Sequence, residues 1–505
     1  MKFLGIKTII VFTSLFHVLT LDIYSQKTRR ISYEANIIEM NTQIAGGAYR
    51  LLGDVVFRHK GTIMYCDSAY YYRTENSLDA FSDVFINRGD TTRLYGDFLH
   101  YDGNREYAEV RDNVRLINKE SELVTDYLDY DMANNLAYYK NGGTLTSEEN
   151  ILVSLEGYYH TDTDVAHFRD SVEITNPDYI ILSDTLVYKL EPEIAFFHGP
   201  TQIIGDSNYI YCEDGWYDTK QDISQLNKNA YMQSKEYIIK GDSLYYDRNN
   251  GYGLATDYVE IIDTIQHVIL AGKFGEYYES SEEALLTDSA MMVQVENGDS
   301  LFLHADTLRS DLDTTGQKIV KAFYQVKFFR PTLQGKCDSL TYVFRDSVIQ
   351  MFNQPVLWSE NRQLTADYIE IYTKDELVDK MVMEDNAFIS MIDDSSTEKY
   401  NQIKGRTING YFRENMVYKI DVLGNAEAVY YPKDDEEYIG LNRAVSSEIT
   451  IFIEEKTIQK IKFLTDVSAT LHPISQVSET EKFLDGFQWL DNLRPNNKYD
   501  IFVWP

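Results

Sequence analysis

Apolar and polar residues alternate with a period of two along most of this chain. Between residues 96 and 116, the positions Asp97, Leu99 and Tyr101 alternate with their neighbours, and the pattern resumes from Ala108 to Leu116. Residues two apart share one face of a β-strand. The intervening Asp-Gly-Asn at 102–104 is typical of a turn. The pattern predicts strands of about 6–9 residues joined by turns, and the repeated region has no convincing helical periodicity.

Three sets of positions recur in phase every 29 residues. The aromatic set is Tyr101, Tyr130, Tyr159, Tyr188, Tyr217 and Tyr246. The aliphatic set is Leu116, Leu145, Ile174, Ile203, Met232 and Ile261. The turn-like set is Asp112, Asn141, Asp170, Gly199, Lys228 and Asp257. A fixed period of this size indicates stacked supersecondary units, since one unit cannot bury its apolar face alone.

The repeat continues beyond Gly251 with looser spacing, because surface turns tolerate insertions. We expect an all-β stack of antiparallel strands over residues 48–470, with about 14 repeats of 29–32 residues. Residues 26–47 form a lead-in, and residues 471–505 a C-terminal tail in which 477–489 are expected to form a short amphipathic helix.

The N-terminal residues 1–25 have the composition of a secretion signal. Lys2 and Lys7 precede an apolar run over residues 9–21, and Ser25 is a small residue at a plausible cleavage point. An N-terminal membrane anchor is the alternative. The apolar run is short for a bilayer span and includes His17, which favours the signal.

Charge and cysteine content narrow the function classes. The formal net charge is −33, which argues against nucleic acid as a partner because that affinity needs clustered Lys and Arg. Three cysteines, Cys66, Cys212 and Cys337, are too few for a disulfide framework and are interpreted as small buried residues.

No motif for catalysis, a metal or a cofactor is found. The histidines are scattered, and the nearest pair, His160 and His167, has no common metal-ligand spacing. Aspartates recur at strand starts, but the dense Gly and Asp of calcium-binding β-rolls are missing. We interpret them as bonding nearby backbone N–H groups. The chain is therefore expected not to be an enzyme.

Tyrosine is the more informative residue, with 40 copies among 505 residues. The repeated tyrosines either pack the interior of the stack or line an apolar groove. The residues proposed for such a groove are Tyr101, Tyr130, Tyr159, Tyr188, Tyr217, Tyr246, Leu116, Leu145, Ile174, Ile203 and Ile261.

The repeated phrase resembles a known family. Gly-Asp-x-Leu-x-Tyr-Asp occurs at 96–102 and again at 241–247, and the second half Ala-x-x-x-Asp-x-Val-x-Leu/Ile follows at 108–116 and, from its Asp, at 257–261. These resemble the repeats of OstA/LptA-like proteins of lipopolysaccharide transport. The resemblance implies a V-shaped antiparallel stack, open along one side, that shields lipid A acyl chains in the periplasm or near the outer membrane. It also implies edge-strand pairing with other transport components, and end-to-end self-association.

This chain is longer than the compact bridge proteins of that family, and its repeats continue to the region where another member has a membrane barrel. A lipopolysaccharide-binding bridge protein is the function that the resemblance favours. A structural or adhesive β-solenoid that binds carbohydrate or protein is the alternative, and a polysaccharide-cleaving β-helix is a third. A groove needs apolar inner walls and an open mouth, whereas a closed solenoid fills its interior.

Overall fold

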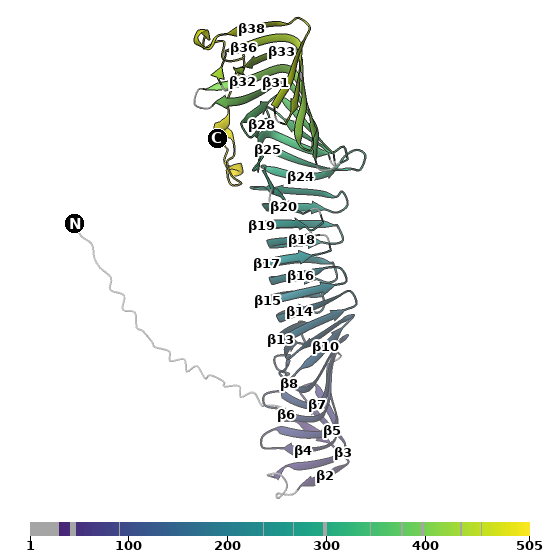
Figure 1. Cartoon of the computed structure of the whole chain (residues 1–505). Coiled ribbons are helices and arrows are strands. Elements are labelled where there is room, and N and C mark those ends of the chain that lie inside the picture. The colour runs from purple at the N-terminus through teal and green to yellow at the C-terminus, as the bar shows by residue number, and fades with distance from the viewer. Residues whose placement is uncertain are drawn as a thin grey trace, which may run out of the picture. The chain divides into compact units, whose positions relative to one another are not determined.

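The chain folds almost entirely into antiparallel β-strands. The computed structural model describes residues 30–40, 47–89, 91–235, 237–265, 267–295, 300–343, 345–374, 377–394, 398–434, 437–455 and 457–504. Thirty-six strands belong to antiparallel sheet, and β34 and β35 pair with each other separately. Over these described ranges, the helices are three short 3-10 turns, η2 (Ile474–Gln476), η3 (Asp491–Leu493) and η4 (Asp500–Phe502). The all-β fold predicted from the alternation is confirmed (Figure 1).

The chain divides into two compact units. The first holds residues 1–119 and 124–137, and the second holds 120–123 and 138–505. The predicted signal at 1–25 lies outside the described residues. Strands of the first unit, with β8 and β9 at its boundary, are β1 (Ser32–Glu34), β2 (Ile37–Met40), β3 (Tyr49–His59), β4 (Thr62–Tyr72), β5 (Ser77–Arg88), β6 (Thr92–Asp102), β7 (Tyr107–Asn118), β8 (Ser121–Asp131) and β9 (Leu136–Tyr139).

The second unit is a succession of strand levels that Figure 1 shows from β10 to β38. Its strands are β10 (Gly143–Ser147), β11 (Asn150–Ser154), β12 (Glu156–His160), β13 (Val165–Asn176), β14 (Tyr179–Lys189), β15 (Ile194–Gly205), β16 (Tyr209–Asp218), β17 (Ile223–Gln233), β18 (Tyr237–Asp247), β19 (Tyr252–Asp263), β20 (Val268–Tyr278), β21 (Glu283–Thr287), β22 (Met291–Gln294), β23 (Leu301–His304), β24 (Thr307–Leu312), β25 (Lys318–Arg330), β26 (Leu333–Val343), β27 (Val348–Phe352), β28 (Val356–Ser359), β29 (Arg362–Thr365), β30 (Tyr368–Lys374), β31 (Leu377–Asp394), β32 (Lys399–Arg413), β33 (Met416–Tyr430), β34 (Lys433–Asp434), β35 (Glu437–Tyr438), β36 (Leu441–Glu454), β37 (Thr457–Leu464) and β38 (Ser468–His472).

The strands are longer than the sequence pattern predicted. β6 has 11 residues and β7 has 12, whereas the expected segments began only at Asp97 and Ala108. Asp97 is the sixth residue of β6, whereas Ala108 is the second residue of β7. An interruption of the alternation inside each strand makes one strand resemble two segments. Leu99 and Tyr101 are buried, but Asp97 is exposed, so the expected common face of these three residues is wrong.

That interruption is a left-handed bulge. Asp112 has a φ of 59° and Asn113 a φ of 51°, and the pairing of β6 with β7 shifts register beside them. A positive φ recurs in the predicted turn-like set at Asp170 (61°), Lys228 (56°) and Asp257 (72°), and Gly199 has a φ of 142°. An extra unpaired residue bends a strand and increases its twist. Five members of the turn-like set therefore mark a bend inside one strand, whereas Asn141 lies between β9 and β10.

Side chains fix some of these bends. The Asn113 amide donates to the Asp97 carboxylate over 2.6 Å, and Asn386 donates to Asp367 over 2.8 Å. Asn tolerates positive φ better than most residues, and here it also bonds the neighbouring strand. The interpretation of the recurring aspartates as partners of backbone N–H groups needs correction at Asp97 and Asp367, whose carboxylates accept from asparagine side chains.

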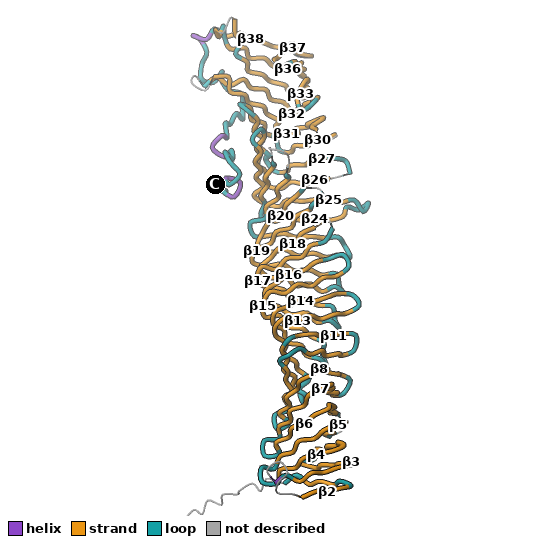
Figure 2. The backbone as a smooth tube through the Cα atoms, turned by 60° about the horizontal axis from the view of Figure 1, so that its bottom comes forward, coloured by secondary structure: helices purple, strands orange, loops and turns teal. Residues whose placement is uncertain are grey.

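The tail differs from its expected structure as well. Residues 477–489 have turns and irregular backbone where an amphipathic helix was expected. Many of their main-chain groups bond side chains of the sheet, which a helix would have to satisfy internally. Figure 2 shows this tail beside the strands of the second unit, with its C-terminal end near β26.

Candidate functional site

A large apolar cavity runs through the second unit. Its volume is about 2930 Å³, and its lining extends from Met232 to Phe463. Both halves of single strands contribute to the lining: β31 supplies Met381 and Met383 before its bend and Ile389 and Met391 after it. The bulges thus turn one strand into two inner walls that face a common space.

Charged residues border this cavity where hairpins turn. Glu360 and Arg362 flank the turn between β28 and β29, and Arg413 and Glu414 flank the turn between β32 and β33. The Arg413 guanidinium lies 4.3 Å from the centre of the Tyr418 ring. An apolar interior with a charged border suits a ligand that has both apolar chains and a polar group.

Most residues proposed for the groove pack inside the stack. The side chains that are at most 7 % exposed are Tyr101, Tyr130, Tyr159, Tyr188, Leu116, Leu145, Ile174 and Ile203. Tyr217 is half-buried, and Tyr246 and Ile261 line the cavity. The set is therefore divided between a filled interior in the earlier repeats and the cavity in the later ones.

Buried tyrosine hydroxyls have polar partners. Tyr101 Oη lies 2.8 Å from His59 Nδ1, Asn150 donates to Tyr188 Oη over 3.1 Å, and Tyr159 donates to Asp164. Burial raises the pKa of Tyr101 and of Tyr188, because the phenolate would lose its hydration. Their hydroxyl groups act as structural hydrogen-bonding groups.

A fourth set of positions accompanies the tyrosines. Directly opposite the tyrosines stand small residues, paired as Tyr101 with Ala108, Tyr159 with Ala166, and Tyr188 with Ala195. A large ring over a small neighbour fills the interior. The later pairs, Tyr217 with Ser224 and Tyr246 with Gly253, contain no alanine and are less buried.

The sequence interpretation missed the later lining residues, which include Leu303, Leu357, Ile371, Met383, Ile403 and Ile420. They lie beyond Gly251, where the spacing loosens and the 29-residue phase no longer locates them. The available signal was the alternation inside each later strand, such as Met381, Met383 and Ile389 within β31.

The cysteines have no chemical role that the structure supports. Cys66, Cys212 and Cys337 are free and buried, and burial raises the pKa of each thiol to about 12. A thiol with so high a pKa forms little thiolate, the nucleophilic species, at neutral pH. A search of the described residues finds no group of His, Cys, Asp and Glu that could hold a metal ion.

Comparison with known proteins agrees with this architecture. The sequence model of the OstA-like protein family matches residues 27–184 and 198–302, just over half of the chain. The chain belongs to the OstA-like family. No curated protein matches the sequence. The matched residues end at 302, whereas the lining of the cavity continues to Phe463.

Membership of the OstA-like family implies a periplasmic function related to transport of lipopolysaccharide and organic solvents. It is a family of transport-bridge proteins rather than of enzymes. Among the described residues of this OstA-like chain, none of the helices has the length and apolar character to cross a bilayer.

Proposed function

We propose that this OstA-like protein binds lipopolysaccharide in the periplasm and shields its lipid A acyl chains in the cavity between Met232 and Phe463. The observation that carries the proposal is the two-walled apolar lining with charged residues at its border. Acyl chains fit the lining, and the partners for the phosphates of lipid A are Arg362 and Arg413, which lie at the border beside Glu360 and Glu414. The protein acts as a carrier, without chemical turnover.

The volume of the cavity supports a ligand with several chains. Drug-sized ligands occupy pockets of roughly 300–1000 Å³, and this cavity holds about 2930 Å³. Each methylene moved from water into such a lining contributes about 0.8 kcal/mol. Burial of chains along the later strands therefore supplies the affinity without a dedicated catalytic or metal group.

The proposal places the chain in the periplasm, after removal of residues 1–25, near the outer membrane. Contacts with other transport components, or between copies, would form at terminal strands. In the part of the chain that the structure describes, β37 and β38 pair only with β36. Leu471 on β38 is 52 % exposed. Open strand edges of this kind accept another strand.

Photo-cross-linking in the native cell envelope tests this proposal. A photoreactive phenylalanine analogue replaces Tyr246, Phe412 or Tyr418, which line the cavity, and Tyr324 serves as control because it is 61 % exposed outside the lining. Lipopolysaccharide adducts are expected at the three lining positions and not at Tyr324. Absence of adducts at all three, or equal adducts at all four, would overturn the proposal and favour a structural β-solenoid.

A further inference from the structure

The C-terminal tail lies across one wall of the groove, and none of its described residues is among those that line the cavity. It passes β36, β32, β29 and β26 in turn and ends beside β23 and β25. Leu484 is 2 % exposed and Ile501 is 1 % exposed, so the tail is anchored at both its beginning and its end.

A single row of side chains across the sheet holds the tail. Successive strands pair Gln334 with Trp358, Trp358 with Gln363, Gln363 with Ser390, Ser390 with Gln402, Gln402 with Val429, and Val429 with Arg443. The three glutamines are at most 3 % exposed. A buried amide is costly unless both its donor and its acceptor are satisfied, and here the tail supplies partners.

Two of these glutamines bind the tail in the same way. The Gln402 amide donates to the Lys482 carbonyl over 2.8 Å, and its oxygen accepts from the Leu484 N–H over 2.8 Å. Gln363 repeats this six residues along, donating to the Gln488 carbonyl and accepting from the Leu490 N–H, both over 2.7 Å. Each side-chain amide thus bonds main-chain groups two residues apart, as a neighbouring strand would.

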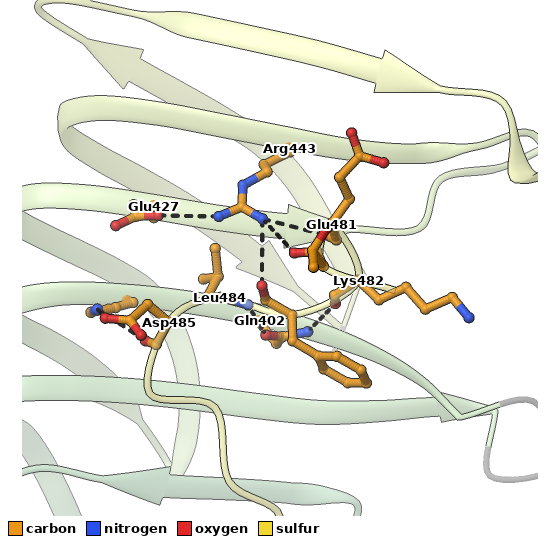
Figure 3. A network of polar contacts seen from close by, with 10 residues as sticks. Gln402, Glu427, Arg443, Glu481, Lys482, Leu484 and Asp485 are labelled. Atoms are coloured by element: carbon orange, nitrogen blue, oxygen red, sulfur yellow. Dashed lines mark hydrogen bonds and ion pairs between the residues drawn. The ribbon is translucent and has the colours of Figure 1, made fainter. Parts of the chain in front are cut away.

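Arginines and lysines hold the two ends of the same path. Figure 3 shows Arg443 beside Glu427 and directed at the tail, where it donates to the carbonyls of Thr480, Glu481 and Phe483 over 3.4–3.5 Å. Arg494 donates to Gln334 over 2.8 Å and to the Glu360 carbonyl, at the border of the cavity, over 3.0 Å. Lys327 donates to the Val503 carbonyl over 2.5 Å.

The strands that hold the tail also form the cavity wall. A parallel row pairs Leu357 with Leu364, Leu364 with Ile389, and Ile389 with Ile403, and all four residues line the cavity. Each is the chain neighbour of a member of the tail-binding row, and successive residues of a strand point to opposite faces. Two members of the tail-binding row, Gln402 and Val429, also border the cavity, so the tail and the cavity share this part of the wall.

We propose that the tail is a clamp that holds this wall in its ligand-competent arrangement, with Gln363 and Gln402 as its positioning residues. This inference rests on the proposed function for its ligand, an acyl chain. Because the tail and the ligand contact the same strands, release of the tail weakens acyl-chain binding without removing any lining side chain.

The test compares full-length protein with two double variants, Gln363→Glu with Gln402→Glu, and Gln363→Leu with Gln402→Leu. The first removes both amide donors and adds charge, and the second removes the hydrogen bonds without adding charge. Gln202→Glu is the control, because Gln202 is exposed on β15. Hydrogen exchange reports on residues 477–490 and on β28–β32, and a fluorescent sixteen-carbon fatty acid reports on the cavity.

In both double variants we expect exchange of residues 477–490 and of β28–β32 to rise about tenfold or more, with β13–β16 unchanged. The dissociation constant for the fatty acid should rise about fivefold or more, and Gln202→Glu should match wild type. A tail whose amide hydrogens stay protected in both double variants would overturn the clamp. So would a released tail that leaves the dissociation constant for the fatty acid and the exchange of β28–β32 unchanged. Wild type that binds no fatty acid would instead refute the proposed ligand, and exchange of β28–β32 alone would then decide the clamp.

Discussion

At the scale of single residues, interior space is set by pairs of large and small side chains. The Tyr139 ring lies between two glycines, and a Cβ built on Gly143 or Gly157 would lie 2.6 or 2.4 Å from it. The Tyr139 hydroxyl lies 2.8 Å from Ser154 Oγ, and burial raises the pKa of Tyr139 to about 12. Gly157 is therefore required for close approach rather than for an unusual backbone angle.

Gly157→Ala should destabilise β12 and its neighbours by about 1–3 kcal/mol, because the ring must shift within a packed interior. Native-state hydrogen exchange of β12 and β13 measures the change. Gly253→Ala on β19 is the matched control, since its added Cβ has no neighbour closer than 3.8 Å. Equal effects of the two substitutions would refute the role given to the Tyr139 ring.

At the scale of elements, the left-handed bulge determines how each strand is used. Asp385 and Asn386, both with a φ of 53°, separate the two halves of β31 that face the cavity from different sides. Asn386 also donates to Asp367, which directly precedes β30. A straight strand would present all its inward side chains to one wall, so the groove depends on these bends.

Asn386→Val should destabilise the bend by about 2 kcal/mol, combining the cost of positive φ for a β-branched residue with the lost hydrogen bond. Asn386→Gly keeps the backbone freedom and loses only the hydrogen bond, so it should cost about 1 kcal/mol or less. Hydrogen exchange of β30 and β31 compares them. A valine variant no worse than the glycine variant would show that backbone conformation does not limit this bend.

At the scale of the whole molecule, ionisable groups buried in a neutral state make folding sensitive to alkali. Burial raises the pKa of Tyr139 and Tyr179 to about 12, and that of the three thiols to about 12. In the unfolded chain these groups titrate near their ordinary values of 10.0 and 9.0. The folded protein thus keeps protons that the unfolded chain releases.

Because the folded state binds more protons over this range, the free energy of unfolding should be independent of these groups below about pH 9 and should fall between about pH 9 and 12. Urea titrations at several pH values measure it, and the part of the tyrosinate absorbance that comes from the buried tyrosines should rise together with loss of β-structure, after the exposed tyrosines have ionised. Full tyrosinate absorbance near pH 10 in a protein that remains folded would contradict this expectation.

Much of the fold could be predicted because a β-repeat has local signals. The alternation around Leu99 and Tyr101 specifies strands, and the 29-residue phase specifies stacking, since each unit must bury its apolar face against a neighbour. The ends of the strands could not be predicted in the same way. The bulge at Asp112 interrupts the alternation, so the two halves of one strand resemble separate segments.

The sequence by itself determined the all-β class, the 29-residue repeat and the positions at which the strands bend. These follow from side-chain periodicity and from residues that tolerate positive φ. Only the tertiary structure decided which inward residues face a filled interior and which face a cavity. The repeat register is the same in both regions, yet Tyr188 is buried opposite Ala195 whereas Tyr246 lines the cavity opposite Gly253, so side-chain packing between strands and not periodicity makes the division. The path of the tail was likewise undetermined, because Gln363 and Gln402 bind main-chain groups, which carry no sequence signature.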